Sequence, residues 1–256
     1  MPTPAADFRL DGKVALVTGA ARGLGAAIAL ALAQAGADLA LGLRDQPSGS
    51  PVVAEITGLG RRVRTYQMDM FSLDQVRLAV HQAQHDFDRI DILVNNAGIG
   101  EPNLAEVVTE RDFDDTLAVN LKGTFFASQE AGRIMIAQNS GCIVNLSSQA
   151  GFIALSSESI YCMTKAAISH LTKCLALEWA QYHITVNAVA PTFIRTPGTR
   201  KWLEDPQNEQ SVLRRIPLGR IGDPVDVAGA VVFLASPAAA LITGATLLID
   251  GGWTIQ

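Results

Sequence analysis

Two residues of this 256-residue chain, Tyr161 and Lys165, have types and a spacing that could support proton transfer. On a helix, positions i and i+4 lie on the same face, so the phenol and the ammonium can serve one site. A free tyrosine has a pKa near ~10 and exchanges protons poorly at neutral pH. A nearby ammonium lowers that pKa, and Ser148, thirteen residues before Tyr161, could hold a substrate oxygen beside the phenol. The same two residues at this spacing could also be a solvated lysine and a half-buried tyrosine, so the prediction of a catalytic pair depends on the rest of the chain.

A glycine-rich turn near the N-terminus predicts a dinucleotide site. The apolar run 14–18 is typical of a buried strand, and residues 26–35 have the composition of a helix. Between them stand Gly19, Gly23 and Gly25, in the spacing TGxxxGxG rather than the GxGxxG of most dinucleotide folds. Gly19 permits a tight turn, while Gly23 and Gly25 leave room for backbone to approach a pyrophosphate at the helix N-terminus.

Strand and helix patterns alternate along the chain. Strand-like apolar runs fall at 14–18, 39–43, 63–68, 90–94, 143–146, 185–189 and 246–249, and helical patterns at 26–35, 51–59, 73–87, 113–119, 123–138, around Tyr161 to about 181, and 223–234. Near-continuous apolar strands separated by helices indicate a parallel sheet covered on both faces. We therefore predict an α/β fold with a single doubly wound Rossmann-like domain over 1–256 and about seven parallel strands. Residues 1–12 are expected to lead into it, and the polar region 192–217 to form a substrate loop.

Composition and charge exclude several classes of protein. The formal net charge is −5 and no basic stripe is present, which argues against a nucleic-acid partner. Cys142, Cys162 and Cys174 are odd in number and form no CxxC pair, so we expect reduced thiols rather than disulfides or a zinc site. His81 and His85 have helical spacing but no surrounding metal-ligand pattern, so no metal is predicted.

The sequence also favours a cytoplasmic protein without a membrane partner. The N-terminal residues lack the basic start and apolar core of a secretion signal. The stretch 23–43 approaches the length of a membrane span, but Gly36 divides it into a helix and a strand.

At these positions the chain resembles the short-chain dehydrogenase/reductases with a single Rossmann-like domain, and the resemblance covers essentially its whole length. The motifs that carry it are Thr18-Gly19-Ala20-Ala21-Arg22-Gly23-Leu24-Gly25, Asn95-Asn96-Ala97-Gly98, Asn120, Asn145-Leu146-Ser147-Ser148, Tyr161 with Lys165, and Asn187-Ala188-Val189-Ala190-Pro191. They occur in the family's order and at its spacings.

The resemblance implies a role for each catalytic candidate. Tyr161 would exchange the proton with the substrate oxygen, and Ser148 would hydrogen-bond that oxygen. Lys165 would hold the nicotinamide ribose and lower the pKa of Tyr161. Asn120 would hold a water in the proton relay, although asparagine is also a favoured helix cap. Ser147 is the alternative serine, but the family spacing to the tyrosine selects Ser148.

The resemblance also implies a nicotinamide dinucleotide as cofactor. The residues expected to contact it are Gly19, Arg22, Gly23, Leu24, Gly25, Arg44, Asp69, Met70, Asn96, Ala97, Gly98, Tyr161, Lys165, Pro191, Ile194 and Thr196. Asn96 to Gly98 could equally form only a strand-end turn. Thr192 stands where the family usually has glycine. Because a β-branched residue disfavours positive φ, the loop must take another backbone path or accept strain.

The end of the second strand bears on the choice between NAD and NADP. An acidic residue there would bind the ribose 2′-OH of NAD, whereas an arginine favours the 2′-phosphate of NADP. Leu43 occupies the acidic position, Arg44 follows it, and Arg22 adds a second positive charge. We therefore predict NADP rather than NAD, although Asp45 could neutralise Arg44.

The substrate is predicted from the polarity of two loops. Ser148, Gln149, Tyr161 and Arg195 are the expected substrate contacts, and such polar groups suit a sugar, sugar acid or polyol. The ending Asp250-Gly251-Gly252-Trp253 also resembles that of family members acting on sugars and sugar acids. A 3-oxoacyl-type carbonyl reductase is the alternative, because such enzymes share most of these motifs. A non-catalytic dinucleotide-binding regulator is the alternative of another class, and it would be expected to lose Ser148, Tyr161 or Lys165.

Apolar helix and strand surfaces predict a homotetramer. On the long helix, Ile168, Leu171, Leu175 and Trp179 form one stripe, and Ala167, His170, Cys174 and Leu177 widen it beyond what one sheet must cover. In the family, the 225–234 helix and the 246–249 strand pack against their counterparts in other subunits. The alternative is that helices of the same chain cover these surfaces.

Overall fold

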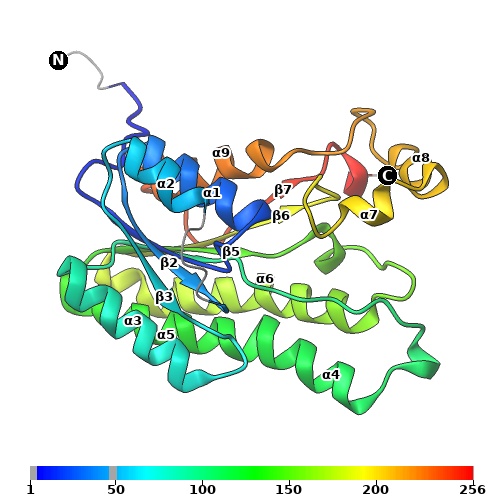
Figure 1. Ribbon diagram of the computed structural model, residues 1–256, viewed down its shortest axis with the longest axis horizontal. Coiled ribbons are helices and arrows are strands. Elements are labelled where there is room, and N and C mark those ends of the chain that lie inside the picture. The colour runs from blue at the N-terminus through cyan, green and yellow to red at the C-terminus, as the bar shows by residue number, and fades with distance from the viewer. Residues whose placement is uncertain (1–4, 46–50, 256) are drawn as a thin grey trace.

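Among the described residues, seven parallel strands form one sheet with helices on both faces, which confirms the predicted fold class (Figure 1). The computed structural model describes residues 5–45 and 51–255, so the first residues of the predicted lead-in lie outside it. The strand order is β3-β2-β1-β4-β5-β6-β7. The strands are β1 (Val14–Thr18), β2 (Asp38–Leu43), β3 (Val63–Gln67), β4 (Ile92–Asn95), β5 (Gly141–Leu146), β6 (Ile184–Pro191) and β7 (Thr246–Ile249).

Helices cover both faces of this sheet and bury a separate apolar cluster on each. One face carries α1 (Gly23–Gln34), α2 (Pro51–Gly58) and α9 (Pro224–Ala235), and the other carries α3 (Leu73–Phe87), α5 (Thr124–Gln138) and α6 (Ser159–Trp179) (Figure 1). Strand β1 supplies both clusters, because successive side chains point to opposite faces: Ala15 and Val17 to one, Val14 and Leu16 to the other. A central parallel strand is therefore apolar throughout.

The strand order places the predicted site residues at the carboxyl ends of neighbouring central strands. β1 and β4 are neighbours, yet the chain leaves β1 for α1 on one face and reaches α5, on the other face, after β4. In open parallel sheets, ligands bind outside the carboxyl ends of the strands at such a switch point. The glycine turn follows β1, Asn96 follows β4, Ser148 follows β5, and Pro191 ends β6.

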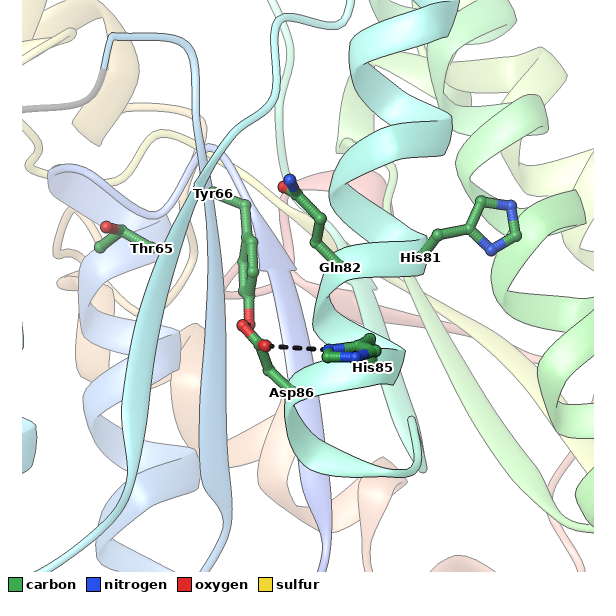
Figure 2. Close-up of a pocket in the computed structure, with 6 residues that line it drawn as sticks. All are labelled: Thr65, Tyr66, His81, Gln82, His85 and Asp86. Carbon is green, nitrogen blue, oxygen red and sulfur yellow. Dashed lines mark hydrogen bonds and ion pairs between the residues drawn. The ribbon is translucent and has the colours of Figure 1, made fainter.

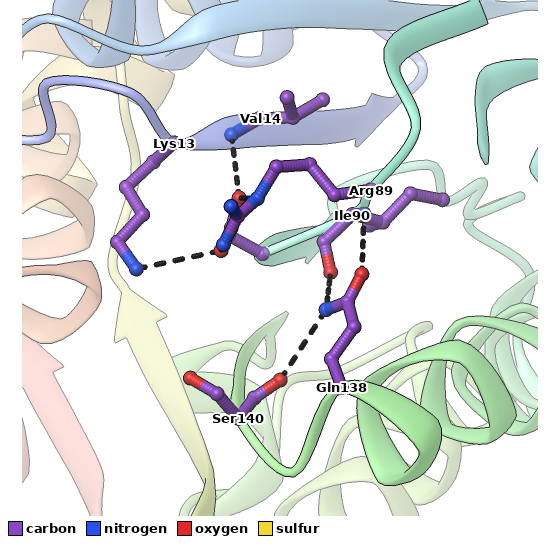
Figure 3. Close-up of polar contacts among 7 residues, drawn as sticks. Lys13, Val14, Arg89, Ile90, Gln138 and Ser140 are labelled. Atoms are coloured by element: carbon purple, nitrogen blue, oxygen red, sulfur yellow. Dashed lines mark hydrogen bonds and ion pairs between the residues drawn. The ribbon is translucent and has the colours of Figure 1, made fainter. Parts of the chain in front are cut away.

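The opposite, amino end of the central strands is held by polar contacts. Asp91 is buried there, and its carboxylate accepts a hydrogen bond from the Val14 amide at 2.9 Å and forms ion pairs with Lys13 and Arg89. Gln138 bonds both the amide and the carbonyl of Ile90, at 3.1 and 2.8 Å (Figure 3). These contacts tie β4 to its neighbours and leave the carboxyl ends free for the site.

The structure corrects two sequence predictions. The helical stretches expected at 113–119 and 123–138 are one continuous run, in which α4 (Glu110–Leu117) passes through a π-helical turn, Ala118–Gly123, into α5. Such turns occur mostly as single insertions inside α-helices and are frequent at functional sites, and this one contains Asn120. The region 192–217 is not only loop, because it forms α7 (Arg200–Leu203) and α8 (Pro206–Leu213), which pack with Trp253 in a third apolar cluster.

The described helices include none long and apolar enough to cross a membrane.

Candidate active site

The turn between β1 and α1 requires glycine at three positions. Gly19 and Gly23 have φ of +67° and +58°, which favours glycine. A Cβ at Gly25 would collide with the Gly19 carbonyl oxygen and lie 2.5 Å from Asn96 Nδ2. Arg22, the N-cap of α1, makes no side-chain capping bond, so the first amides of the helix keep no side-chain partner. This turn fits a dinucleotide pyrophosphate, which such amides bind.

The segment after β4 is locked to β1. The Thr18 hydroxyl accepts hydrogen bonds from the amides of Asn96 and Ala97, both at 3.0 Å, and Asn96 Nδ2 donates to the Thr18 carbonyl at 2.9 Å. The segment therefore has a structural role as well as its predicted place beside the cofactor. Gly98 continues it towards α6: a Cβ there would lie 3.3 Å from Asn120 Oδ1 and 3.5 Å from Lys165 Nζ.

The first turns of α6 bring Tyr161 and Lys165 to the same end of the sheet, at the carboxyl ends of the strands. Lys165 Nζ lies 5.4 Å from the centre of the Tyr161 ring and donates a hydrogen bond to the Leu146 carbonyl at 2.7 Å. Lys165 is only 5% exposed, so it is not a solvated surface lysine. Ser148 is buried after β5, where its hydroxyl accepts from the Ala150 amide at 3.1 Å and lies 3.5 Å from the Pro191 carbonyl.

Asn120 is held by the π-helical turn and does not cap a helix. Its Oδ1 accepts from the Ile99 amide at 2.8 Å, and its Nδ2 donates to the Ile99 carbonyl at 2.8 Å and to the Thr164 hydroxyl at 3.1 Å. Thr164 immediately precedes Lys165, so these bonds connect the segment after β4 to α6. Sequence reasoning overlooked Thr164, although its adjacency to Lys165 is visible in the sequence.

The predicted lowering of the Tyr161 pKa is wrong for the chain alone. Burial raises the pKa of Tyr161 to about 12, although a hydrogen bond from Ser148 works in the opposite direction. Burial also lowers the pKa of Lys165 to about 8. Both charged forms lose water at this site, and desolvation outweighs the attraction expected from the spacing.

We expect the buried lysine to make stability depend on pH. Below about pH 8 the folded and unfolded chains both hold the Lys165 proton, whereas between about 8 and the ordinary pKa of 10.5 only the unfolded chain holds it. The unfolded chain then binds more protons, so the free energy of unfolding rises with pH, by roughly 1–3 kcal/mol up to pH 10 relative to Lys165→Met. Tyr161, with its raised pKa, opposes this trend only above its ordinary value of 10.

Denaturant unfolding at a series of pH values measures this difference. Lys173→Met, which removes an exposed lysine from the same helix, should keep the wild-type slope. Parallel curves for the wild type and Lys165→Met between pH 8 and 10 would show that Lys165 is not desolvated.

Several other predicted contacts have partners within the chain. Arg195 donates to Glu209 at 2.7 Å, and the Asp69 carboxylate accepts from the Phe71 amide at 3.0 Å. Ile194 and Met70 are buried in the apolar clusters, with Leu24 packed partly against one of them. Thr196 lies opposite the glycine turn, since a Cβ at Gly23 would be 3.6 Å from Thr196 Cβ.

Three further positions bear on cofactor and substrate. Arg44 is exposed and pairs loosely with Asp45 at 3.5 Å. Thr192 avoids strain, because its φ is not positive, but its buried hydroxyl oxygen has no hydrogen-bond partner among the described residues. Gln149 is 1% exposed, and its side-chain oxygen likewise lacks a partner in the described part of the chain.

The histidine pair lies away from this site. His81, His85 and Asp86 line a hollow between β3 and α3, in which His85 turns to Asp86, 3.3 Å away, while His81 points elsewhere (Figure 2). His81 is 3.6 Å from Glu130 instead. Across residues 5–45 and 51–255, no group of three histidine, cysteine or acidic side chains could hold a metal ion.

Comparison with known proteins gives consistent matches over almost the whole chain. The family described as enoyl-(acyl carrier protein) reductase matches residues 19–254. D-threitol dehydrogenase of Mycolicibacterium smegmatis is 42% identical over 250 residues, which cover 98% of this chain and 96% of that protein. A short-chain type dehydrogenase/reductase from Mycobacterium marinum superposes with a TM-score of 0.93 at 37% identity, covering 98% of each chain. The gluconate 5-dehydrogenase of Burkholderia cenocepacia, solved with NADP and tartrate, has a TM-score of 0.94 at 35% identity and the same coverage.

Proposed function

Because this chain belongs to the short-chain dehydrogenase/reductase family and is an NAD(P)-dependent oxidoreductase acting on CH–OH groups, we propose that its substrate is a sugar, sugar acid or polyol. The observation that carries the proposed site is the convergence of Tyr161, Lys165, Ser148 and Asn120 beside the glycine turn. Relatives that act on threitol and gluconate support the substrate class.

Each of these side chains has a proposed part in the reaction. Tyr161 takes the proton from the substrate hydroxyl or returns it to the carbonyl oxygen, and Ser148 holds that oxygen. Lys165 binds the nicotinamide ribose, and its ammonium favours the phenolate form of Tyr161 when the cofactor and substrate are bound. Asn120 positions a water that continues the proton path. The bound dinucleotide supplies hydride acceptance and donation.

The glycine turn and the segment after β4 are proposed to hold this dinucleotide. Gly19, Gly23 and Gly25 leave space for the pyrophosphate, and Asn96 to Gly98 would flank the cofactor. Leu24, Asp69, Met70, Pro191, Ile194 and Thr196 remain proposed contacts of the cofactor. The residues among them whose side chains are buried would contact the cofactor through their backbone atoms.

We expect Arg44→Ala to weaken NADP binding about tenfold more than NAD binding, because a charge-assisted bond to the 2′-phosphate is lost. NADP is the proposed preference, since no acidic residue occupies the Leu43 position and Arg22 lies nearby at the start of α1. Fluorescence titration with both cofactors measures the ratio, and Arg111→Ala, at an exposed arginine of α4, serves as control. Equal losses for the two cofactors would refute discrimination by Arg44.

The substrate class is tested by cofactor absorbance with both dinucleotides. The panel contains aldoses, polyols, sugar acids and 3-oxoesters. Turnover of sugars, sugar acids or polyols supports the proposal. A strong preference for 3-oxoesters would favour the second candidate, an acyl-type carbonyl reductase, since a 3-oxoacyl-(acyl carrier protein) reductase of Thermotoga maritima is 42% identical to this chain over 248 residues.

A cytoplasmic homotetramer is the proposed form of the protein. Three free cysteines suit a reducing compartment. Stripe residues Ile168 and Leu175 are buried, whereas Leu177 is 83% exposed on α6 and Val225 is 72% exposed on α9. Leu247 and Leu248 are also exposed on the edge strand β7. Such apolar surfaces usually mark interfaces between subunits.

We expect light scattering at micromolar concentration to give four times the 27.1 kDa mass of one chain. Leu177→Lys should lower this mass, because it places a charge on an exposed apolar position without disturbing the core. Leu59→Lys, at an exposed position at the end of α2, should leave it unchanged. The mass of a single chain for the wild type would end the proposal.

A further inference from the structure

The Glu158 carboxylate lies beside Tyr161 where the chain enters α6, and the Glu101 carboxylate is near enough to Glu158 to raise its pKa. Glu158 is the N-cap residue of α6, three residues before Tyr161, and it is half-buried. Gly100 adjoins both, since a Cβ there would be 3.6 Å from Glu158 Oε2 and 3.2 Å from Tyr161 Cδ2. Glu101 directly follows Gly100, and the pKa of Glu158 is raised by burial and by Glu101. Within the described part of the chain, neither carboxylate has a hydrogen bond or ion pair.

The arginines of the predicted substrate loop are already paired with acids. Arg195 binds Glu209 at 2.7 Å, and Arg200 binds Glu204 at 3.0 Å. Lys201 is exposed on α7. A substrate carboxylate reaching this loop would compete with an existing carboxylate for each of these two arginines.

Two buried polar atoms close to Ser148 or its contacts have no hydrogen-bond partner among the described residues. The Gln149 side-chain oxygen is buried without a partner one residue after Ser148. The Thr192 hydroxyl is buried without a partner one residue after Pro191, whose carbonyl lies 3.5 Å from the Ser148 hydroxyl. Buried polar groups are normally hydrogen-bonded: the Gln149 oxygen needs a donor, which an O–H group supplies and a carboxylate does not, whereas the Thr192 hydroxyl can pair with either.

We propose that Glu158 and Glu101 make the site selective for an uncharged polyol or neutral sugar over the corresponding sugar acid, an inference that rests on the function proposed above. Substrate hydroxyls can donate to these carboxylates and to the Gln149 oxygen. A substrate carboxylate cannot donate, and it is repelled at short range in a partly buried site. Glu158 and Glu101 thus determine specificity, whereas Tyr161 retains the proton transfer.

Three six-carbon ligands that differ in one terminal group test this selectivity. Glucitol, gluconate and glucamine end in a hydroxymethyl, a carboxylate and an ammonium group. Calorimetric titration into the enzyme saturated with oxidised cofactor gives their dissociation constants, and absorbance gives kcat/KM. We expect glucitol to be favoured over gluconate by at least about tenfold in the wild type. The threitol and threonate pair repeats the comparison at four carbons.

Charge-neutral variants assign the effect to the two residues. Glu158→Gln should reduce the ratio of glucitol to gluconate affinity by about tenfold, and Glu101→Gln by a smaller factor because it is exposed. Glu55→Gln, which removes an exposed carboxylate from α2, should leave the ratio unchanged. Cofactor titration checks that each variant is folded.

The outcomes separate this inference from the proposed function. Equal or tighter binding of gluconate, a ratio insensitive to both variants, or binding of none of the ligands would each overturn the selectivity, whereas glucamine binding at least as tightly as glucitol would support it. Charge-dependent binding without turnover of any polyol or sugar would instead support the selectivity and contradict the proposed function. Turnover of glucitol and gluconate at similar kcat/KM would support the proposed function and contradict the selectivity.

Discussion

Replacing Tyr161 by phenylalanine should reduce turnover at least about a hundredfold, the size of effect expected for loss of a general acid–base group. The substitution removes only the hydroxyl, so the ring still packs over Lys165, 5.4 Å from its Nζ. Cofactor binding should therefore stay nearly unchanged. Steady-state rates and fluorescence titration of the dinucleotide measure the two quantities separately.

A matched control lies in the 3₁₀ turn Ala180–Tyr182, just beyond the other end of α6. Tyr182 is half-buried and packs against the apolar cluster beneath α6, away from the site. Tyr182→Phe should keep wild-type turnover. If Tyr161→Phe retained a tenth or more of the wild-type rate, Tyr161 would not be the proton donor and acceptor.

Ser148→Ala should lower turnover by about a hundredfold or more without a large loss of stability. Ser147→Ala should instead lower the stability of the fold and leave turnover close to that of the wild type. The Ser147 hydroxyl is buried and bonded to the Lys165 carbonyl at 2.9 Å and to the Ser169 hydroxyl at 2.8 Å, so it joins β5 to α6. Its removal should cost about 1 kcal/mol of unfolding free energy. The Ser148 hydroxyl accepts a 3.1 Å bond from the Ala150 amide, lies 3.5 Å from the Pro191 carbonyl and hydrogen-bonds the Tyr161 side chain, so it lies where a substrate oxygen would meet the phenol.

Rates and denaturant unfolding on both variants decide between the serines. The comparison is informative because the two residues are adjacent and chemically identical. A large loss of turnover in Ser147→Ala, with Ser148→Ala near wild type, would reverse the assignment that the spacing to Tyr161 favours.

Local patterns in the sequence determined most of the fold. Apolar runs such as that of β1 predict buried parallel strands because both of their faces must be covered. The glycines of the first turn predict positive φ and close backbone approach, and Gly19 and Gly23 have that conformation. The spacing of Tyr161 and Lys165 predicts a shared helix face because a helix repeats every ~3.6 residues. Each of these patterns depends on neighbours in sequence.

Local patterns therefore predict the fold class and the helix face that Tyr161 and Lys165 share, whereas the electrostatics of the site depend on tertiary packing. Arg195 is a free cation in the sequence and a partner of Glu209 in the fold. Tyr161 has a raised rather than lowered pKa, because the amount of water around a group depends on everything packed against it. Glu158 lies three residues before Tyr161 in the sequence, yet only the approach of Gly100 from the end of β4 shows that its carboxylate adjoins the phenol. Charge pairing and desolvation arise from segments distant along the chain, which no local pattern records.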